Sequence, residues 1–108
     1  MACIFCKIVA GEIPSKKVHE DEEFLAFHDI RPHAPVHFLV IPKRHIDSLA
    51  HVQADDAPML GRMMTLVSRL ARENGLEAGF KTGINTGREG GQEVDHLHIH
   101  VLGGWKRG

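Results

Sequence analysis

The chain has 108 residues, of which 43% are hydrophobic and 25% are charged. That length and composition predict a single globular domain over residues 1–108. The 13 basic and 14 acidic side chains give a formal net charge of −1, which argues against nucleic-acid binding because that usually requires a basic excess. The N-terminus lacks the features of a signal peptide, and no apolar run approaches the roughly 20 residues of a membrane helix. We therefore expect a cytoplasmic protein with no membrane or nucleic-acid partner.

The first half of the chain predicts short elements. Apolar runs separated by turn residues favour strands, and the run HFLVIP at 37–42 has the pattern of a buried strand. Two prolines within 30–35 indicate a loop. The expected elements are a short helix or turn at 3–9, strands at 17–20, 24–29 and 37–42, and a helical turn near 46–50.

The second half contains the clearest helix. Apolar residues recur at helical spacing from about position 54 to 74, and Pro58 lies in the expected first turn. Strands are expected at 80–85 and 94–102, with a glycine-rich turn at 86–91 between them. This order predicts an α+β fold, with an antiparallel meander sheet, one long helix and a short N-terminal helix.

Nine histidines are the most unusual feature of the composition, because this side chain suits metal binding, nucleophilic attack and proton transfer near neutral pH. Three of them alternate in the last predicted strand, where successive side chains point to opposite faces. One face is expected to carry His96, His98 and His100, and the other Leu97, Ile99 and Val101. Such a row of imidazoles favours metal chelation, or acid–base and nucleophilic chemistry on a phosphate, over a merely solvated polar face.

The segment HLHIHVL at 96–102 follows an HxHxHxx pattern in which x is apolar, and it resembles the histidine triad family. Further segments resemble the family in the same order along nearly the whole chain, namely 4–8, 11–14, 26–30, 37–43 and 90–92. The sequence Val-Leu-Gly-Gly at 101–104 is similar to the branch of small nucleoside phosphoramidases. The resemblance implies a hydrolase that binds a purine nucleotide resembling AMP.

The resemblance also implies the roles of individual residues. His98 would attack the α-phosphorus and form a nucleotidyl-histidine intermediate, which water then hydrolyses. His100 would contact the phosphate oxygens, and His37 would support the triad, which consists of His96, His98 and His100. The catalytic candidates are His98, His100, His37 and Glu93. The nucleotide-binding candidates are Phe5, Phe27, His28, Asp29, Ile30, Asn85, Gly91, Gln92, Glu93, His98 and His100.

Within the nucleotide-binding set, Phe5, Phe27 and Ile30 match the family's apolar pocket for the base. Judged from the residues alone, the same three side chains would be core residues. Asp29 matches the carboxylate that binds the ribose hydroxyls. The glycines of the loop 87–91 would let main-chain N–H groups approach the phosphate.

Two features depart from the phosphoramidase branch. Glu93 replaces a serine that this branch often carries near the leaving group, and a carboxyl there can pass a proton to a departing amine. The sequence reaches Gly108 soon after Trp105, whereas members of the family continue further with a tail that shapes the pocket across a dimer. The resemblance also implies a homodimer, in which the sheets of two chains become continuous.

The only two cysteines, Cys3 and Cys6, form a CxxC pair. In a chain without an export signal, such a pair favours a metal site or a redox site over a structural disulfide. Two unpaired small residues are the remaining interpretation. Family members with a similar start bind zinc, and the resemblance implies a structural site made of Cys3, Cys6, His45 and His96.

Purine nucleoside phosphoramidase activity, the cleavage of a P–N bond at the α-phosphate, is therefore the first functional hypothesis. A dinucleoside polyphosphate hydrolase would use the same nucleophile with another leaving group. A nucleotide-binding scaffold with little turnover is an alternative from another class. In a metal-dependent hydrolase, the triad itself would hold a catalytic metal, and the resemblance argues against that reading.

Overall fold

The computed structural model describes residues 3–106. It has an α+β fold with one five-stranded antiparallel sheet in the order β1-β2-β3-β5-β4. The strands are β1 (Lys17–Glu20), β2 (Phe24–His28), β3 (Val36–Pro42), β4 (Phe80–Gly83) and β5 (Ile99–Gly103). The helices are α1 (Ile4–Val9) and α2 (Ala57–Glu73), with three single 3₁₀ turns at Leu49–His51, Ala54–Asp56 and Arg88–Gly90.

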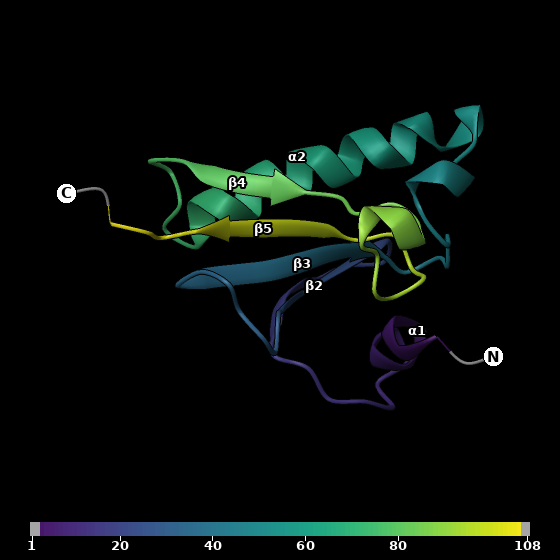
Figure 1. Cartoon of the computed structure of the whole chain (residues 1–108), viewed down its shortest axis with the longest axis horizontal. Coiled ribbons are helices and arrows are strands. Elements are labelled where there is room, and N and C mark those ends of the chain that lie inside the picture. The colour runs from purple at the N-terminus through teal and green to yellow at the C-terminus, as the bar shows by residue number, and fades with distance from the viewer. Residues whose placement is uncertain (1–2, 107–108) are drawn as a thin grey trace.

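Helices cover both faces of the sheet (Figure 1). The long helix α2 buries an apolar stripe that includes Met63, Leu66 and Leu70 against one face. The short helix α1 packs Phe5 and Ile8 against the opposite face. The predicted α+β class, antiparallel sheet, long helix and short N-terminal helix are therefore confirmed.

The strand β3 pairs with both β2 and β5 and is covered on both faces, which explains why its apolar run does not alternate with polar residues. Residues 37–42 are all buried. Phe38 and Val40 face α2, whereas Leu39 and Ile41 face α1. By the same alternation, the buried side chain of His37 lies on the α1 face.

The last strand is shorter than predicted, because it begins at Ile99 rather than at position 94. Its last register pair with β3 joins Ile99 to Val40, so continued pairing would place Leu97 opposite Pro42, which has no N–H to donate. The N–H of Leu97 instead donates to the carbonyl of Ile46 at 2.7 Å. The pairing of β5 with β3 therefore ends at Ile99, and the segment 94–98, which carries His96 and His98, lies outside the ladder.

The other differences are smaller. The sheet is a meander only through β3, because β5 lies between β3 and β4. The predicted helix at 54–74 is split into a 3₁₀ turn and α2, since Pro58 lies in the first turn of α2. The predicted strand at 80–85 ends at Gly83. Over residues 3–106, no helix combines the length and apolar character that crossing a membrane requires.

Candidate functional site

The predicted division of the triad segment between two faces is confirmed. Leu97, Ile99 and Val101 belong to the core under α2. The ring of His98 contacts Phe5 of α1 with ring centroids 5.2 Å apart, and the ring of His96 contacts the same phenyl ring at 6.0 Å. The rings of His98 and His100 are 5.0 Å apart. The α1 face of the sheet therefore carries the imidazoles of His96, His98 and His100, although of these three only His100 lies in a strand.

His98 is 5% exposed, and its Nδ1 lies 2.7 Å from the main-chain carbonyl oxygen of His96. Because a carbonyl can only accept a hydrogen bond, Nδ1 must carry the proton. In the neutral ring, Nε2 then holds the free lone pair. The bend that takes 94–98 off the sheet ladder thus gives His98 the tautomer that a nucleophile requires.

His100 and His37 form a second pair of rings. The His37 Nε2 and His100 Nδ1 atoms are 3.0 Å apart, and the main-chain N–H of His33 donates to His37 Nδ1 at 3.1 Å. The Asp29 carboxylate lies 3.5 Å from His37 Nε2. Desolvation by burial is the main cause that lowers the pKa of both His37 and His100 below the ordinary value of 6.5. Both rings are therefore neutral at pH 7.

These lowered pKa values predict a loss of stability in acid. The unfolded chain protonates its histidines near pH 6.5, whereas the folded state resists protonation of His37 and His100, so the unfolded state binds more protons and the free energy of unfolding falls as the pH drops. Urea unfolding between pH 7.5 and 5 measures this slope. We expect a smaller slope in His100→Gln than in the wild type or in the control His28→Gln, which alters an exposed residue and leaves His37 and His100 in place. Equal slopes in all three proteins would contradict the prediction.

The residues expected to hold the base are only partly brought together. Phe5 and Phe27 are buried and meet edge to face with centroids 5.3 Å apart, so both belong to the core at α1, and Phe5 also contacts the ring of His98. Ile30 is 93% exposed and belongs to no core. His28 is exposed and Asp29 is half-buried, with its Oδ1 accepting the main-chain N–H of Arg31 at 2.8 Å.

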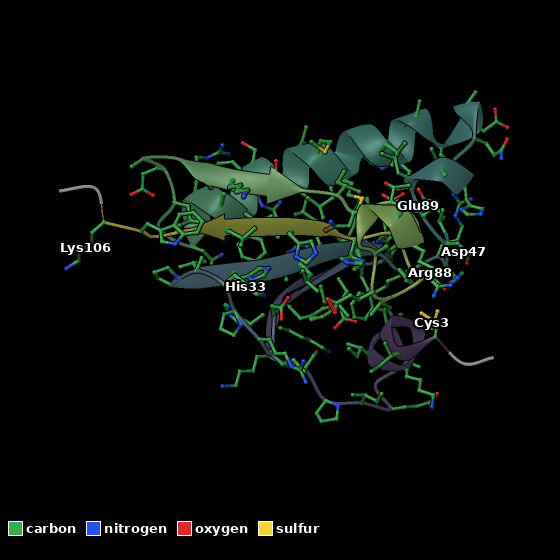
Figure 2. All side chains as sticks on the ribbon, viewed as in Figure 1. Cys3, His33, Asp47, Arg88, Glu89 and Lys106 are labelled. Atoms are coloured by element: carbon green, nitrogen blue, oxygen red, sulfur yellow. The ribbon has the colours of Figure 1, made fainter. Side chains whose placement is uncertain are left out.

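The glycine-rich loop is held by side-chain amides. Asn85 Nδ2 donates to the carbonyl of Gly90 at 2.8 Å, and Gly91 adopts a left-handed conformation with φ of 79° that favours glycine. Gln92 accepts the N–H of Gly87 at 2.8 Å through Oε1, and its Nε2 donates to two main-chain carbonyls. Glu93 is exposed. Figure 2 shows the loop residues Arg88 and Glu89 at the end of the molecule that also carries Asp47.

The contacts of Gln92 indicate that its side chain holds the loop in shape. Its Nε2 bonds reach the carbonyls of Asp47 at 2.7 Å and Val94 at 2.9 Å. Replacing it by glutamate keeps the side-chain shape but turns a carboxylate oxygen toward both carbonyls. We expect Gln92→Glu to lose about 2 kcal/mol of stability and to bind nucleotide more weakly, as measured by thermal unfolding and calorimetric titration. The control Glu89→Gln alters an exposed residue of the same loop, and an equal effect of both changes would contradict this role.

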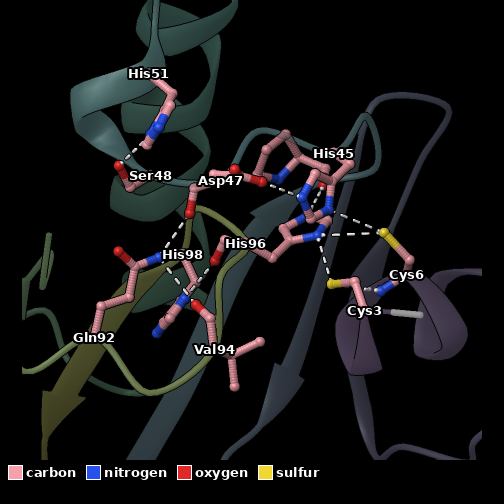
Figure 3. A network of polar contacts seen from close by, with 11 residues as sticks. Cys3, Cys6, His45, Asp47, Ser48, His51, Gln92, Val94, His96 and His98 are labelled. Atoms are coloured by element: carbon pink, nitrogen blue, oxygen red, sulfur yellow. Dashed lines mark hydrogen bonds and ion pairs between the residues drawn. The ribbon is translucent and has the colours of Figure 1, made fainter. Parts of the chain in front are cut away.

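A metal-ligand cluster lies where α1 meets the triad segment, and it contains all four predicted ligands (Figure 3). His96 Nδ1 lies 3.4 Å from Cys3 Sγ and 3.6 Å from Cys6 Sγ, and His45 Nδ1 lies 3.2 Å from Cys6 Sγ. Tetrahedral zinc with ordinary Zn–S and Zn–N bonds separates such atoms by about 3.5 Å. The donor set and its spacing therefore fit a closed Cys₂His₂ zinc site.

Both histidines of this cluster are already oriented for a metal. His96 donates from Nε2 to the carbonyl of Pro42 at 2.8 Å, and His45 donates from Nε2 to Asp47 Oδ1 at 2.5 Å. Each Nδ1 is left with its lone pair toward the thiols, which is how ligating histidines are held in metalloproteins. Sequence reasoning missed Asp47, and its only signal was a position two residues after His45.

Comparison with known proteins identifies the family of the chain. The family model for "Scavenger mRNA decapping enzyme C-term binding" matches residues 2–106. Protein HitA of Neisseria gonorrhoeae is 58% identical over 101 residues, which cover 94% of both chains. The chain belongs to the histidine triad family.

Solved structures of other histidine triad proteins share the fold. A HIT family hydrolase from Legionella pneumophila is 47% identical with a TM-score of 0.94, covering 97% of this chain and 95% of that one. A histidine triad nucleotide-binding protein from Candida albicans is 35% identical with a TM-score of 0.84, covering 99% and 85%. A zinc-bound family member from Mycobacterium smegmatis is 40% identical with a TM-score of 0.79, covering 94% and 74%.

Proposed function

We propose that this histidine triad protein is a nucleotide hydrolase that cleaves the P–N bond of purine nucleoside 5′-phosphoramidates through a nucleotidyl-histidine intermediate on His98. The observation that carries the proposal is the 2.7 Å contact between His98 Nδ1 and the carbonyl of His96. It leaves the Nε2 lone pair available for attack on the α-phosphorus. Family membership among hydrolases and nucleotide-binding proteins supports the same reaction class.

In the first step, the lone pair of His98 Nε2 forms a bond to phosphorus, and the P–N bond to the substrate amine breaks. The amine keeps the electron pair and takes a proton, for which the Glu93 carboxyl is the proposed donor. The ring becomes cationic, and its Nδ1–H bond to the carbonyl of His96 strengthens with that charge. His100 would stabilise the negative phosphate oxygens.

In the second step, a water oxygen attacks phosphorus and the bond from phosphorus to His98 Nε2 breaks. The electron pair returns to Nε2, and the water proton passes to the Glu93 carboxylate. The products are a nucleoside monophosphate and an amine, and both side chains recover their starting protonation. Splitting one displacement into two steps lowers the barrier of each.

The runner-up is a dinucleoside polyphosphate hydrolase, which would use the same nucleophile with a phosphate leaving group. Steady-state assays with adenosine 5′-phosphoramidate and diadenosine tetraphosphate compare the two. The proposal requires a higher kcat/KM for the phosphoramidate. A preference for the polyphosphate selects the runner-up, and nucleotide binding by calorimetry without turnover of either compound selects a scaffold role.

Zinc at Cys3, Cys6, His45 and His96 is proposed as structural. When bound, it would connect α1 to the segment that carries His98, and a zinc-bound family member supports the presence of such a metal. A catalytic metal held by all three triad histidines is disfavoured, because His96 turns its free Nδ1 toward the thiols of Cys3 and Cys6.

A homodimer is also proposed. The strand β4 is at the edge of the sheet, and exposed edges tend to pair with another chain. Phe80 on β4 is 41% exposed, Ile84 just after it is 37% exposed, and Met64 on α2 is 50% exposed. Antiparallel pairing of two β4 strands would make the sheets of two chains continuous and would bring Phe80 to the contact between them, and sedimentation equilibrium tests the proposal by distinguishing a dimer from a monomer.

A further inference from the structure

The imidazole of His37 has a hydrogen-bond neighbour at each nitrogen. On one side, the main-chain N–H of His33 donates to His37 Nδ1 at 3.1 Å. On the other side, His37 Nε2 lies 3.0 Å from His100 Nδ1. His33 belongs to the loop between β2 and β3, and Figure 2 shows its side chain beside β3. The three groups form a chain that runs from the loop to the triad.

The first contact sets the direction of the second. A main-chain N–H can only donate, so His37 Nδ1 must supply a lone pair. The neutral ring of His37 then carries its proton on Nε2 and donates to His100 Nδ1. The opposite direction would place a proton on His37 Nδ1 facing the N–H of His33, which leaves two donors without an acceptor. The proton of neutral His100 is consequently on Nε2.

We infer that the main-chain N–H of His33 selects the tautomer of His100 through His37, so that His33 and His37 are positioning residues for the reacting phosphate. His100 then presents an N–H donor, while His98 presents a lone pair. A donor for phosphate oxygens beside a nucleophile for phosphorus is the pair that the proposed function requires. The inference rests on that function for its purpose, but not for the tautomers themselves.

The donor direction from His37 to His100 requires both imidazoles to be neutral, and their surroundings keep them so. His37 is 3% exposed, and burial lowers the pKa of both His37 and His100. The ring of His33 lies 5.8 Å from that of His37 and opposes its protonation, as His98 opposes that of His100. The Asp29 carboxylate, 3.5 Å from His37 Nε2, favours a proton on that nitrogen whether the His37 ring is neutral or cationic.

The same contact argues against a second metal site. Ligand atoms of Asp29, His37 and His100 lie within 4.8 Å of one another and offer two imidazoles and a carboxylate. A metal on His37 Nε2 would move the ring proton to Nδ1, where it would face the N–H of His33. The main-chain donor therefore reserves these groups for hydrogen bonding.

Nitrogen NMR of histidine-labelled wild-type protein at pH 7.5, recorded without nucleotide, tests the inference directly. We expect His37 and His100 to be neutral with the proton on Nε2, and His98 to carry its proton on Nδ1. A His37 ring that is protonated on Nδ1 only, or on both nitrogens, would overturn the inference. This experiment measures no turnover. If the expected tautomers were found in a protein that proved to hydrolyse no nucleotide, the missing activity would refute the proposed function and this inference would stand.

A matched pair of variants tests the main-chain donor. His33→Pro removes both the ring and the N–H, whereas His33→Ala removes the ring alone. We expect mixed tautomers at His37 and His100 in the proline variant only, and a kcat about tenfold lower than in the alanine variant, in keeping with the loss of one hydrogen bond. Identical tautomers in two natively folded variants would overturn the inference. If His33→Pro does not fold, the wild-type spectrum decides.

Discussion

Replacing His98 by alanine is expected to lower kcat on a nucleoside 5′-phosphoramidate by about 10⁴-fold or more, as losing the nucleophile does in other covalent enzymes. The physical reason is that no other lone pair is available at this position. His96 turns its Nδ1 toward the two thiols, and the His100 Nδ1 accepts from His37. Neither ring can take over the attack on phosphorus.

The measurement combines steady-state kinetics with trapping of the intermediate. Rapid quenching under neutral or alkaline conditions, followed by intact-mass analysis, should show a nucleotidyl adduct on the wild type and none on His98→Ala. The control His51→Ala removes an exposed histidine that contacts Ser48 at 2.7 Å, outside the triad. Turnover of His98→Ala within tenfold of the wild type would exclude His98 as the nucleophile.

The face assignments could be predicted from sequence because they depend on local alternation. Leu97 and Ile99 pack under α2 as expected, while His98 and His100 lie on the other face. The strand boundary could not be predicted in the same way. It depends on the register of β3, which would place Pro42 opposite Leu97 if the pairing continued, and on the carbonyl of Ile46. Both are contacts between segments distant in sequence.

The candidate site could likewise be predicted from sequence only in part. The four metal ligands were found because a CxxC pair and the family resemblance name residue types, and the structure brings these residues together. The direction of the His33–His37–His100 chain was not found, because it depends on a main-chain N–H that any residue except proline provides. Ile30 is a further case, since an apolar residue between turn residues can equally be core or, as here, 93% exposed.

Removing the proposed zinc is expected to lower the free energy of unfolding more than Gln92→Glu does. Cys3 and Cys6 flank the first turn of α1, which has only six residues and is too short to be stable alone. Zinc would tie this helix to His45 and to the fully buried His96. A ligand present at 1,000 times its dissociation constant stabilises the folded state by about 4 kcal/mol, which corresponds to a decrease in Tm of roughly 10–20 °C on its removal.

Metal analysis and thermal unfolding of Cys6→Ser provide the measurement. We expect about one zinc per chain in the wild type and in the control His51→Ala, with little zinc and a lower Tm in Cys6→Ser. Burial raises the pKa of the Cys6 thiol, so the metal-free Cys6 thiol remains protonated at neutral pH and zinc affinity should fall as the pH drops. Wild-type protein that lacks zinc after gentle purification, and does not gain stability when zinc is added, would refute the site.

The consequence for catalysis separates a structural zinc from a catalytic one. Phe5 on α1 contacts the ring of His98, so loosening α1 should weaken nucleotide binding and raise KM as the helix detaches. A structural metal predicts that chelated protein keeps turnover at temperatures where circular dichroism shows it folded, and loses it along the unfolding transition. Loss of turnover within seconds of chelation, in protein that is still folded, would instead place the metal in the chemistry and return the triad to the metal-dependent reading.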